Sequence, residues 1–171
     1  LWVLPLQRGV NVLVSDYGNS GSSVFEPQGG FLRIWWRVGS GESVFSTAQG
    51  LGIGIEGNVY ASDHWNDRVQ VFDPQGRFLL KWGIRGSGDG EFSQPLGLPI
   101  ASDDHIYVSH HRTDRIHNFD PPITYLSTQG IDWDRDRHFR SPTALPVATD
   151  DAVAAAHYCR PNTAPTQSIR D

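Results

Sequence analysis

The sequence repeats itself at an offset of 47 residues, and the repeat runs without a gap along the chain. The repeated positions are mostly apolar or aromatic, which is typical of a core that is built several times over. They include Leu4, Leu51, Leu98 and Leu145; Val12, Val59, Ile106 and Val153; Phe25, Phe72 and Phe119; Phe45, Phe92 and Phe139; and Trp35 and Trp82. At this period the 171 residues hold about 3.6 repeats.

The second repeat divides into four short strands joined by turns. Residues 50–55 are glycine-rich and apolar, and we expect them to form the innermost strand, because glycine suits the crowded place where strands converge. Residues 59–62, 68–72 and 77–82 follow as three further strands, with the proline- and glycine-containing turn 73–76 before the last. Four strands in a unit of this length are typical of a propeller blade. The predicted fold class is therefore an all-β β-propeller built from four-stranded blades.

Composition and charge narrow the function. The 18 glycines and 11 prolines fall between short apolar runs, which argues against a helix bundle. The net charge of −5 without a basic face argues against nucleic-acid binding. No apolar run approaches the about 20 residues of a membrane span, and the single cysteine, Cys159, allows no internal disulfide. The first residues do not resemble a secretory signal, so only a processed chain would be expected outside the cell or in the periplasm.

The stretch from Gly57 to Leu98 resembles an NHL repeat. The residues that carry the resemblance are Asp63, Asn66, Arg68, Val69, Phe72, Gly76, Gly83, Gly90, Phe92 and Pro95. The other repeats match more loosely. In the third, His110 and Thr113 replace the aspartate and the asparagine while Arg115 remains. The resemblance implies a β-propeller, usually six-bladed, of a family whose members most often act as interaction platforms.

The repeat predicts a single propeller segment over residues 1–171. Its blades are expected at approximately 1–47, 48–94 and 95–141, with an incomplete blade at 142–171. A six-bladed ring at this period would need about 280 residues, and an open ring would expose apolar blade faces at its ends. The chain is therefore expected to be a fragment, to close a ring with another copy, or to close as a four-bladed propeller; the first two are favoured.

The side chains of Asp63, Asn66 and Arg68 invite a reading as a polar binding site. Because they belong to the repeat pattern, we expect them instead to satisfy the backbone of a turn and to pair with a neighbouring blade, with Arg68 binding carbonyls or a carboxylate.

The histidines give a second candidate site. His64 and His111 occupy equivalent positions in adjacent blades, and so do His110 and His157, at the position where the repeat has aspartate. Equivalent positions lie on the same face of a propeller, so the imidazoles could gather there. His110 and His157 are the candidates for a divalent metal, although a solvated or hydrogen-bonded role is the stronger expectation and no short-spaced pair supports a metal. The predicted binding face comprises Asp16, Tyr17, Asp63, His64, Trp65, Asn66, His110, His111, His157 and Tyr158.

Three functions remain open. The first is a non-catalytic binding or scaffolding module, without a cofactor, whose loop face binds a protein. The second is a metal-assisted lyase or hydrolase that resembles amidating lyases or streptogramin lyases. Amidating lyases carry a histidine after the proline that opens an innermost strand, and here Leu96 and Thr143 stand at those positions; His110, His157 and Asp63 would take the streptogramin-lyase roles. The third is a structural subunit that self-associates.

Overall fold

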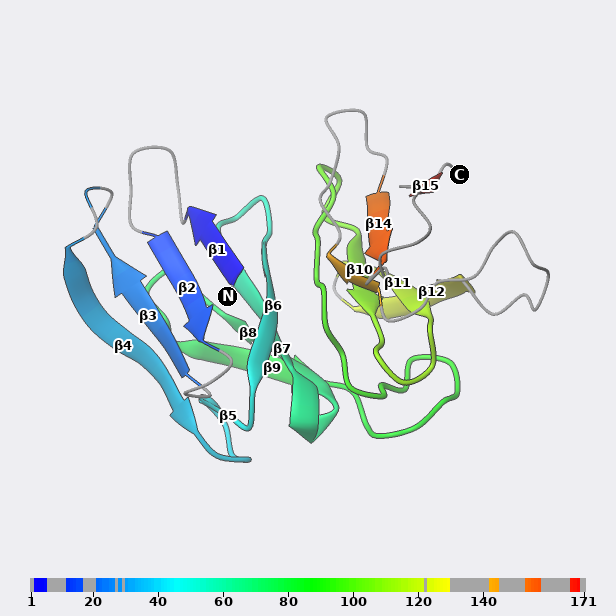
Figure 1. Cartoon of the computed structure of the whole chain (residues 1–171), viewed down its shortest axis with the longest axis horizontal. Helices are drawn as coiled ribbons and strands as arrows, with labels where there is room; N and C mark the ends of the chain where they lie inside the picture. The colour runs from blue at the N-terminus through cyan, green and yellow to red at the C-terminus, as the bar shows by residue number, and fades with distance from the viewer. Residues whose placement is uncertain are drawn as a thin grey trace.

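The computed structural model describes residues 2–5, 12–16, 21–26, 28, 30–121, 123–129, 142–144, 153–157 and 167–169. The described chain is all-β apart from one short 3-10 helix, η1 (His64–Asn66), and it contains no helix long and apolar enough to cross a membrane. Its strands form four sheets that follow one another along the chain, with β6 lying against β1 and β2 (Figure 1). Within each sheet, neighbouring strands pair antiparallel except for β4 and β5.

The second sheet matches the prediction for the second repeat strand by strand. Its four strands are β6 (Ala48–Ile53), β7 (Val59–Asp63), β8 (Arg68–Phe72) and β9 (Phe78–Trp82), in that spatial order. The predicted turn at 73–76 is present, because the Gly76 amide donates to the Asp73 carbonyl and Asp73 Oδ1 accepts from the Gln75 and Arg77 amides. The segment 68–72, in which apolar and polar residues alternate, forms the strand β8 as predicted and pairs with β7 and β9.

The first sheet corrects one detail of the repeat. Its strands are β1 (Trp2–Pro5), β2 (Val12–Asp16), β3 (Gly21–Phe25), β4 (Phe31–Val38) and the short parallel β5 (Val44–Phe45). Ser23 pairs with Ile34 and Ser22 pairs with Trp36, so Trp35 lies in a β-bulge between them. Since Val69, the equivalent of Ser22, pairs with Trp82, the structural equivalent of Trp82 is Trp36. The sequence alignment that paired Trp35 with Trp82 is therefore wrong by one residue. The β-bulge shifts the pairing of β4 by one residue, whereas the 47-residue spacing of the sequence does not reveal it.

The third and fourth sheets each contain three strands. They comprise β10 (Ile106–Ser109), β11 (Ile116–Asp120) and β12 (Thr124–Gln129), and then β13 (Pro142–Ala144), β14 (Val153–His157) and β15 (Gln167–Ile169). Before β10, residues 95–100 take the place of an innermost strand: Leu96 and Ser109 share a backbone hydrogen bond, and isolated bridges join Pro95 to His110 and Ile100 to Ile106.

The backbone repeats as faithfully as the sequence does. Left-handed φ angles recur 47 residues apart, in the pairs Ser43 (59°) and Gly90 (73°), Gly57 (80°) and Asp104 (66°), Asp67 (48°) and Asp114 (51°), and Gly76 (87°) and Ile123 (114°). Glycine adopts such angles without steric cost. A β-branched residue does not, so Ile123 holds a strained conformation that the repeated turn imposes on it.

Apolar clusters fill the space between successive sheets. Between the first and second, Trp36 packs on Phe45 and Phe72, with ring centroids 4.6 and 4.9 Å apart. Between the second and third, Phe92 and Phe119 pack with Trp82. Stacking neighbouring sheets in this way buries faces that one sheet alone would expose.

Two glycines of β6 allow the inner strands to approach each other. A Cβ on Gly50 would lie 2.0 Å from the Leu96 carbonyl oxygen, and one on Gly52 would lie 2.5 Å from that of Leu98. The expected crowding at the innermost strand is therefore present.

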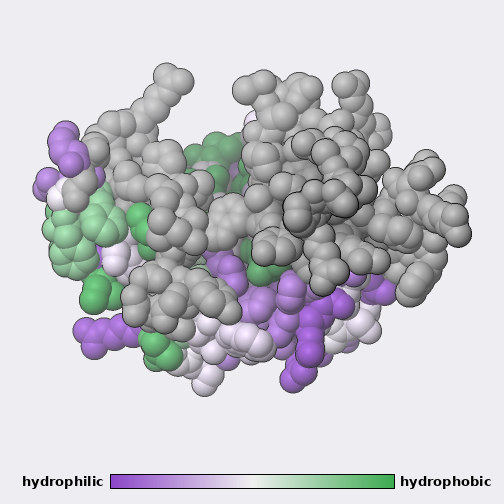
Figure 2. All heavy atoms as spheres, in the orientation of Figure 1, coloured by the Kyte–Doolittle hydropathy of each residue, from purple (hydrophilic) through white to green (hydrophobic). Residues whose placement is uncertain are grey.

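An apolar surface remains exposed on β4. Phe31, Ile34 and Val38 are 60%, 62% and 66% exposed, and hydrophobic side chains gather at this end of the molecule (Figure 2). In the second sheet, the equivalent of Phe31 is Phe78, which packs partly buried against the core shared with the first sheet. β4 thus carries exposed apolar side chains that no described residues cover.

Candidate functional site

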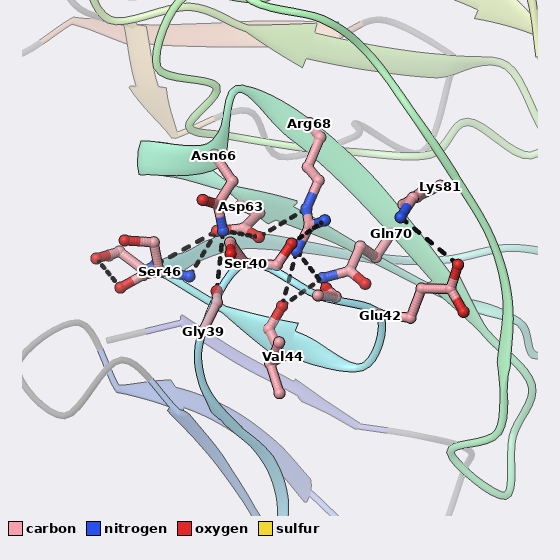
Figure 3. Close-up of polar contacts among 12 residues, drawn as sticks. Gly39, Ser40, Glu42, Val44, Ser46, Asp63, Asn66, Arg68, Gln70 and Lys81 are labelled. Atoms are coloured by element: carbon pink, nitrogen blue, oxygen red, sulfur yellow. Dashed lines mark hydrogen bonds and ion pairs between the residues drawn. The ribbon is translucent and has the colours of Figure 1, made fainter.

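The connection between β7 and β8 is organised around the Asp63 carboxylate (Figure 3). Oδ1 accepts from the backbone amide of Ser46 at 2.9 Å, and Oδ2 accepts from Asn66 Nδ2 at 2.8 Å and from Arg68 Nε at 2.9 Å. Asp63 is fully buried. Burial raises its pKa, and the hydrogen bonds from Asn66, Ser46 and Arg68 oppose that rise. The carboxylate therefore ties the turn of the second sheet to the chain that precedes β6.

Arg68 extends this tie across the boundary between the sheets. Its terminal nitrogens donate to the carbonyl oxygens of Ser40, Gly41 and Val44, all in the segment that follows β4. Gln70 Nε2 donates to the Val44 carbonyl as well. The expectation that these residues pair with the neighbouring blade, with Arg68 binding carbonyls and a carboxylate, agrees with these contacts. The expectation that they satisfy the backbone of their own turn is wrong for Asp63, whose carboxylate makes no capping bond there and accepts from the Ser46 amide instead.

The second part of the site consists of three ring side chains, of which Trp65 and His111 are exposed and His64 is buried. Trp65, at the tip of the turn, is 55% exposed and stands edge-on to His64, with ring centroids 5.0 Å apart. His111, from the next sheet, is exposed, and its ring lies 6.0 Å from that of His64. We call Trp65, His64 and His111 the loop face. The equivalent positions 64 and 111 thus lie side by side, and the wider binding face stays a prediction.

His64 is the fixed centre of the loop face. It is 5% exposed, and its Nδ1 lies 3.3 Å from the Pro95 carbonyl oxygen. Because a carbonyl only accepts, Nδ1 carries the proton and Nε2 carries the lone pair of the neutral ring. Burial lowers the pKa of His64; the bond to Pro95 opposes this, and His111 lowers it further. His64 is accordingly a neutral, oriented imidazole that supports Trp65.

His110 lies elsewhere than expected for a residue of an exposed face. It is fully buried beside His117, with ring centroids 4.3 Å apart, and its ring packs on Phe92 at 5.2 Å. Burial, and then His117 and Arg115, lower the pKa of His110 to about 3. Burial and Arg115 lower the pKa of His117 to about 4. The guanidinium beside these rings disfavours a metal cation between them.

The remaining predicted residues divide into two groups. Asp63 is buried and Asn66 half-buried within the network, so Asp63 adds no exposed surface to a binding face. Asp16 and His157 end β2 and β14, where the structure describes only their backbone. Tyr17 and Tyr158 lie outside the described residues. Within the described part of the chain, no group of three or more His, Cys, Asp or Glu side chains could hold a metal ion.

Two residues of the site escaped the sequence reading. Gln70 and His117 occupy the same repeat position, and both are fully buried beside the turn that precedes them. Gln70 bonds the segment at the start of β5, donating to the Val44 carbonyl and accepting from the Ser43 amide, whereas His117 lies against His110. The sequence signal for them is that each is a polar residue that follows an apolar residue of a strand, at the same place in the 47-residue repeat.

Comparison with known proteins identifies the fold family. Residues 54–144 match the family described as 6-bladed β-propeller, and this covers more than half of the chain. The chain belongs to that family, and the predicted all-β propeller fold is confirmed. The NHL assignment stays a prediction. No curated protein sequence matches.

Solved structures show the same fold at low identity. A streptogramin B lyase superposes with a TM-score of 0.68 and 12% identity, over 91% of this chain and 47% of its own. Virginiamycin B lyase from Staphylococcus aureus gives 0.67 and 11%, over 99% and 55%. A protein of unknown function from Bacteroides caccae gives 0.59 and 15%, over 90% and 51%. The chain spans about half the length of these structures, and the likeness concerns the fold alone.

Proposed function

We propose that this chain is a non-catalytic part of a β-propeller that binds a protein partner through the loop face. The observation that carries the proposal is the presentation of Trp65: a large aromatic side chain, 55% exposed, on a turn held by the His64 amide, which donates to the Thr47 carbonyl, and by the side-chain bond from Asn66 to the buried Asp63. Exposed aromatic side chains on rigid supports are typical anchors of protein interfaces, because they bury much area at a small entropic cost.

The neighbouring side chains agree with this role. His111 extends the surface onto the next sheet, and the buried His64 between them packs against both rings. A protein that binds here would span two blades, as is common for platforms built on repeats.

A photo-crosslinking amino acid placed at position 65 tests the proposal in cells that express the whole protein. The matched control is position 75, exposed on the turn at the opposite end of β8. We expect a discrete protein adduct from position 65, lost when His111→Ala is added, and none from position 75. Equal adducts from both positions would overturn the proposal.

Self-association is a second candidate, because the exposed Phe31, Ile34 and Val38 give β4 an apolar surface. Sedimentation velocity at several concentrations tests it, with Ile34→Arg as the disrupting variant and Gln75→Arg as the control. A concentration-dependent mass that only Ile34→Arg abolishes would support this candidate, and a monomer at all concentrations would exclude it.

A further inference from the structure

The turns of the second and third sheets share backbone features but have different side-chain anchors, and the 3-10 helix η1 forms in the second. In the second-blade turn (residues 63–68), the His64 amide donates to the Thr47 carbonyl at 2.9 Å; in the third-blade turn (residues 110–115), the His111 amide donates to the Gln94 carbonyl at 3.0 Å. These two hydrogen bonds are related by the 47-residue repeat, and so are the left-handed residues Asp67 and Asp114. The clearest difference between the two turns therefore lies in their side-chain contacts.

In the second-blade turn, the Asp63 carboxylate accepts hydrogen bonds at both of its oxygens. Asp63 accepts from the Ser46 amide, Asn66 and Arg68, and Arg68 continues to three backbone carbonyls of the preceding segment. Bonds to charged groups are about twice as strong as neutral ones. To open, this turn must break all of them together.

The third-blade turn has His110 at the position of this carboxylate, and the network does not form. Neither ring nitrogen of His110 or His117 has a hydrogen-bond partner among the described residues, and the same is true of Thr113 Oγ1 and Arg115 Nε. These two atoms correspond to the Asn66 and Arg68 donors of the second-blade turn. Of the three carbonyl bonds of Arg68, Arg115 retains one, to Ser87.

Unsatisfied buried groups shift the balance toward opening. Each orphaned donor or acceptor loses its bond to water when the turn closes and regains that bond when it opens. The ring contacts of His110 and His117 with Phe92 oppose opening, as does the Asp67 carboxylate, which accepts from the Gln94 amide at 2.7 Å. These contacts involve Phe92 and Gln94, which lie before the third blade, and they do not include the residues at the tip of the third-blade turn.

We propose that the third-blade turn opens locally while the second-blade turn stays closed, because His110 replaces the carboxylate that fastens the repeat. The turn carries His111, so on the proposed function it is the adjustable half of the loop face, beside the rigid half that carries Trp65. The opening itself does not depend on that function.

Hydrogen exchange read by NMR at single amides tests this in one molecule, because the His64 and His111 amides are matched. We expect the His111 amide to exchange at least about tenfold faster than the His64 amide after correction for intrinsic rates. In His110→Asp, which restores the residue of the second blade, exchange at His111 should slow toward that of His64. The control His105→Gln, at the other end of β10, should leave both amides unchanged.

The reciprocal variant keeps the test decisive if His110→Asp does not fold. Asp63→His should accelerate exchange at His64 and bring it to the level of His111. Equal protection of the two amides in the unmodified protein would overturn the proposal. So would a folded His110→Asp variant with unchanged exchange at His111. A failure of partner binding at the loop face would leave these results untouched.

Discussion

Asp63 Oδ2 and Arg68 Nε lie 2.9 Å apart, directly across the β7–β8 pair, with side chains 0% and 9% exposed. Arg68 also reaches three carbonyls of the segment after β4. A pair that would ordinarily stabilise one hairpin therefore joins two sheets. Burying both charges costs solvation free energy, and the hydrogen bonds that the carboxylate accepts from Ser46, Asn66 and Arg68 offset this cost. A buried ion pair stabilises a structure only when its remaining hydrogen-bonding groups are satisfied in this way.

Removing the charge of Asp63 should weaken this joint strongly. Asp63→Asn leaves Arg68 buried without a counter-charge, and we expect the free energy of unfolding to fall by about 3 kcal/mol, measured by urea denaturation. The control is Lys81→Ala, which removes an exposed pair with Glu42 at 3.5 Å and should cost less than about 1 kcal/mol. Similar losses in the two variants would show that the Asp63 pair has no special role.

The inner strand should be equally intolerant of a single methyl group. Gly50→Ala would place a Cβ 2.0 Å from the Leu96 carbonyl oxygen and 2.8 Å from the Leu98 nitrogen, both backbone atoms that cannot move aside singly. We expect a loss of about 2–3 kcal/mol in the free energy of unfolding. In Gly41→Ala the nearest atom would be Val44 Cγ2 at an ordinary 3.6 Å, so this control should unfold as the unmodified protein does.

The sequence predicted the fold well because the fold is repetitive. One clear repeat, residues 57–98, was enough to place β7, β8 and β9, and the offset of 47 carried the pattern to its neighbours. The bulge at Trp35 was not predictable, since it is set by pairing with Ser22 and Ser23 and not by the repeat length.

The candidate site was predictable only in part. Position in the repeat placed His64 beside His111, but it could not show that His110, the residue before His111, faces the core. Adjacent residues of a strand point to opposite sides, and the choice between the sides depends on packing against Phe92.

Trp65 should matter for binding and not for stability. Its side chain is 55% exposed and its described ring contact is with His64, so Trp65→Ala should change the free energy of unfolding by no more than about 0.5 kcal/mol. Trp36→Ala, at a side chain that is 1% exposed, should cost about 3–5 kcal/mol. Thermal or urea unfolding of both variants checks the contrast. A large loss in Trp65→Ala would make this residue a structural one and remove the main support for the loop face.

Acid should destabilise the third blade through its buried histidines. Burial first, with Arg115, lowers the pKa of His117 to about 4, and His110 is lowered to about 3. In the unfolded chain both titrate near the ordinary value of 6.5. Below that pH the unfolded state binds protons that the folded state does not, so stability falls as the pH drops from about 6.5 to about 4. Between pH 7 and pH 5 each histidine should remove about 1–2 kcal/mol.

His117→Gln isolates this effect, because it installs the residue that the second blade carries at the same position, Gln70. Urea denaturation at pH 7 and pH 5 should show a loss smaller by about 1–2 kcal/mol in His117→Gln than in the unmodified protein. His105→Gln is the control: His105 is partly exposed and pairs with Asp103 at 2.6 Å, so its replacement should leave the loss caused by the buried pair in place. If the unmodified protein and His117→Gln lose the same stability on acidification, His117 is protonated in the folded protein and its burial does not govern the response to pH.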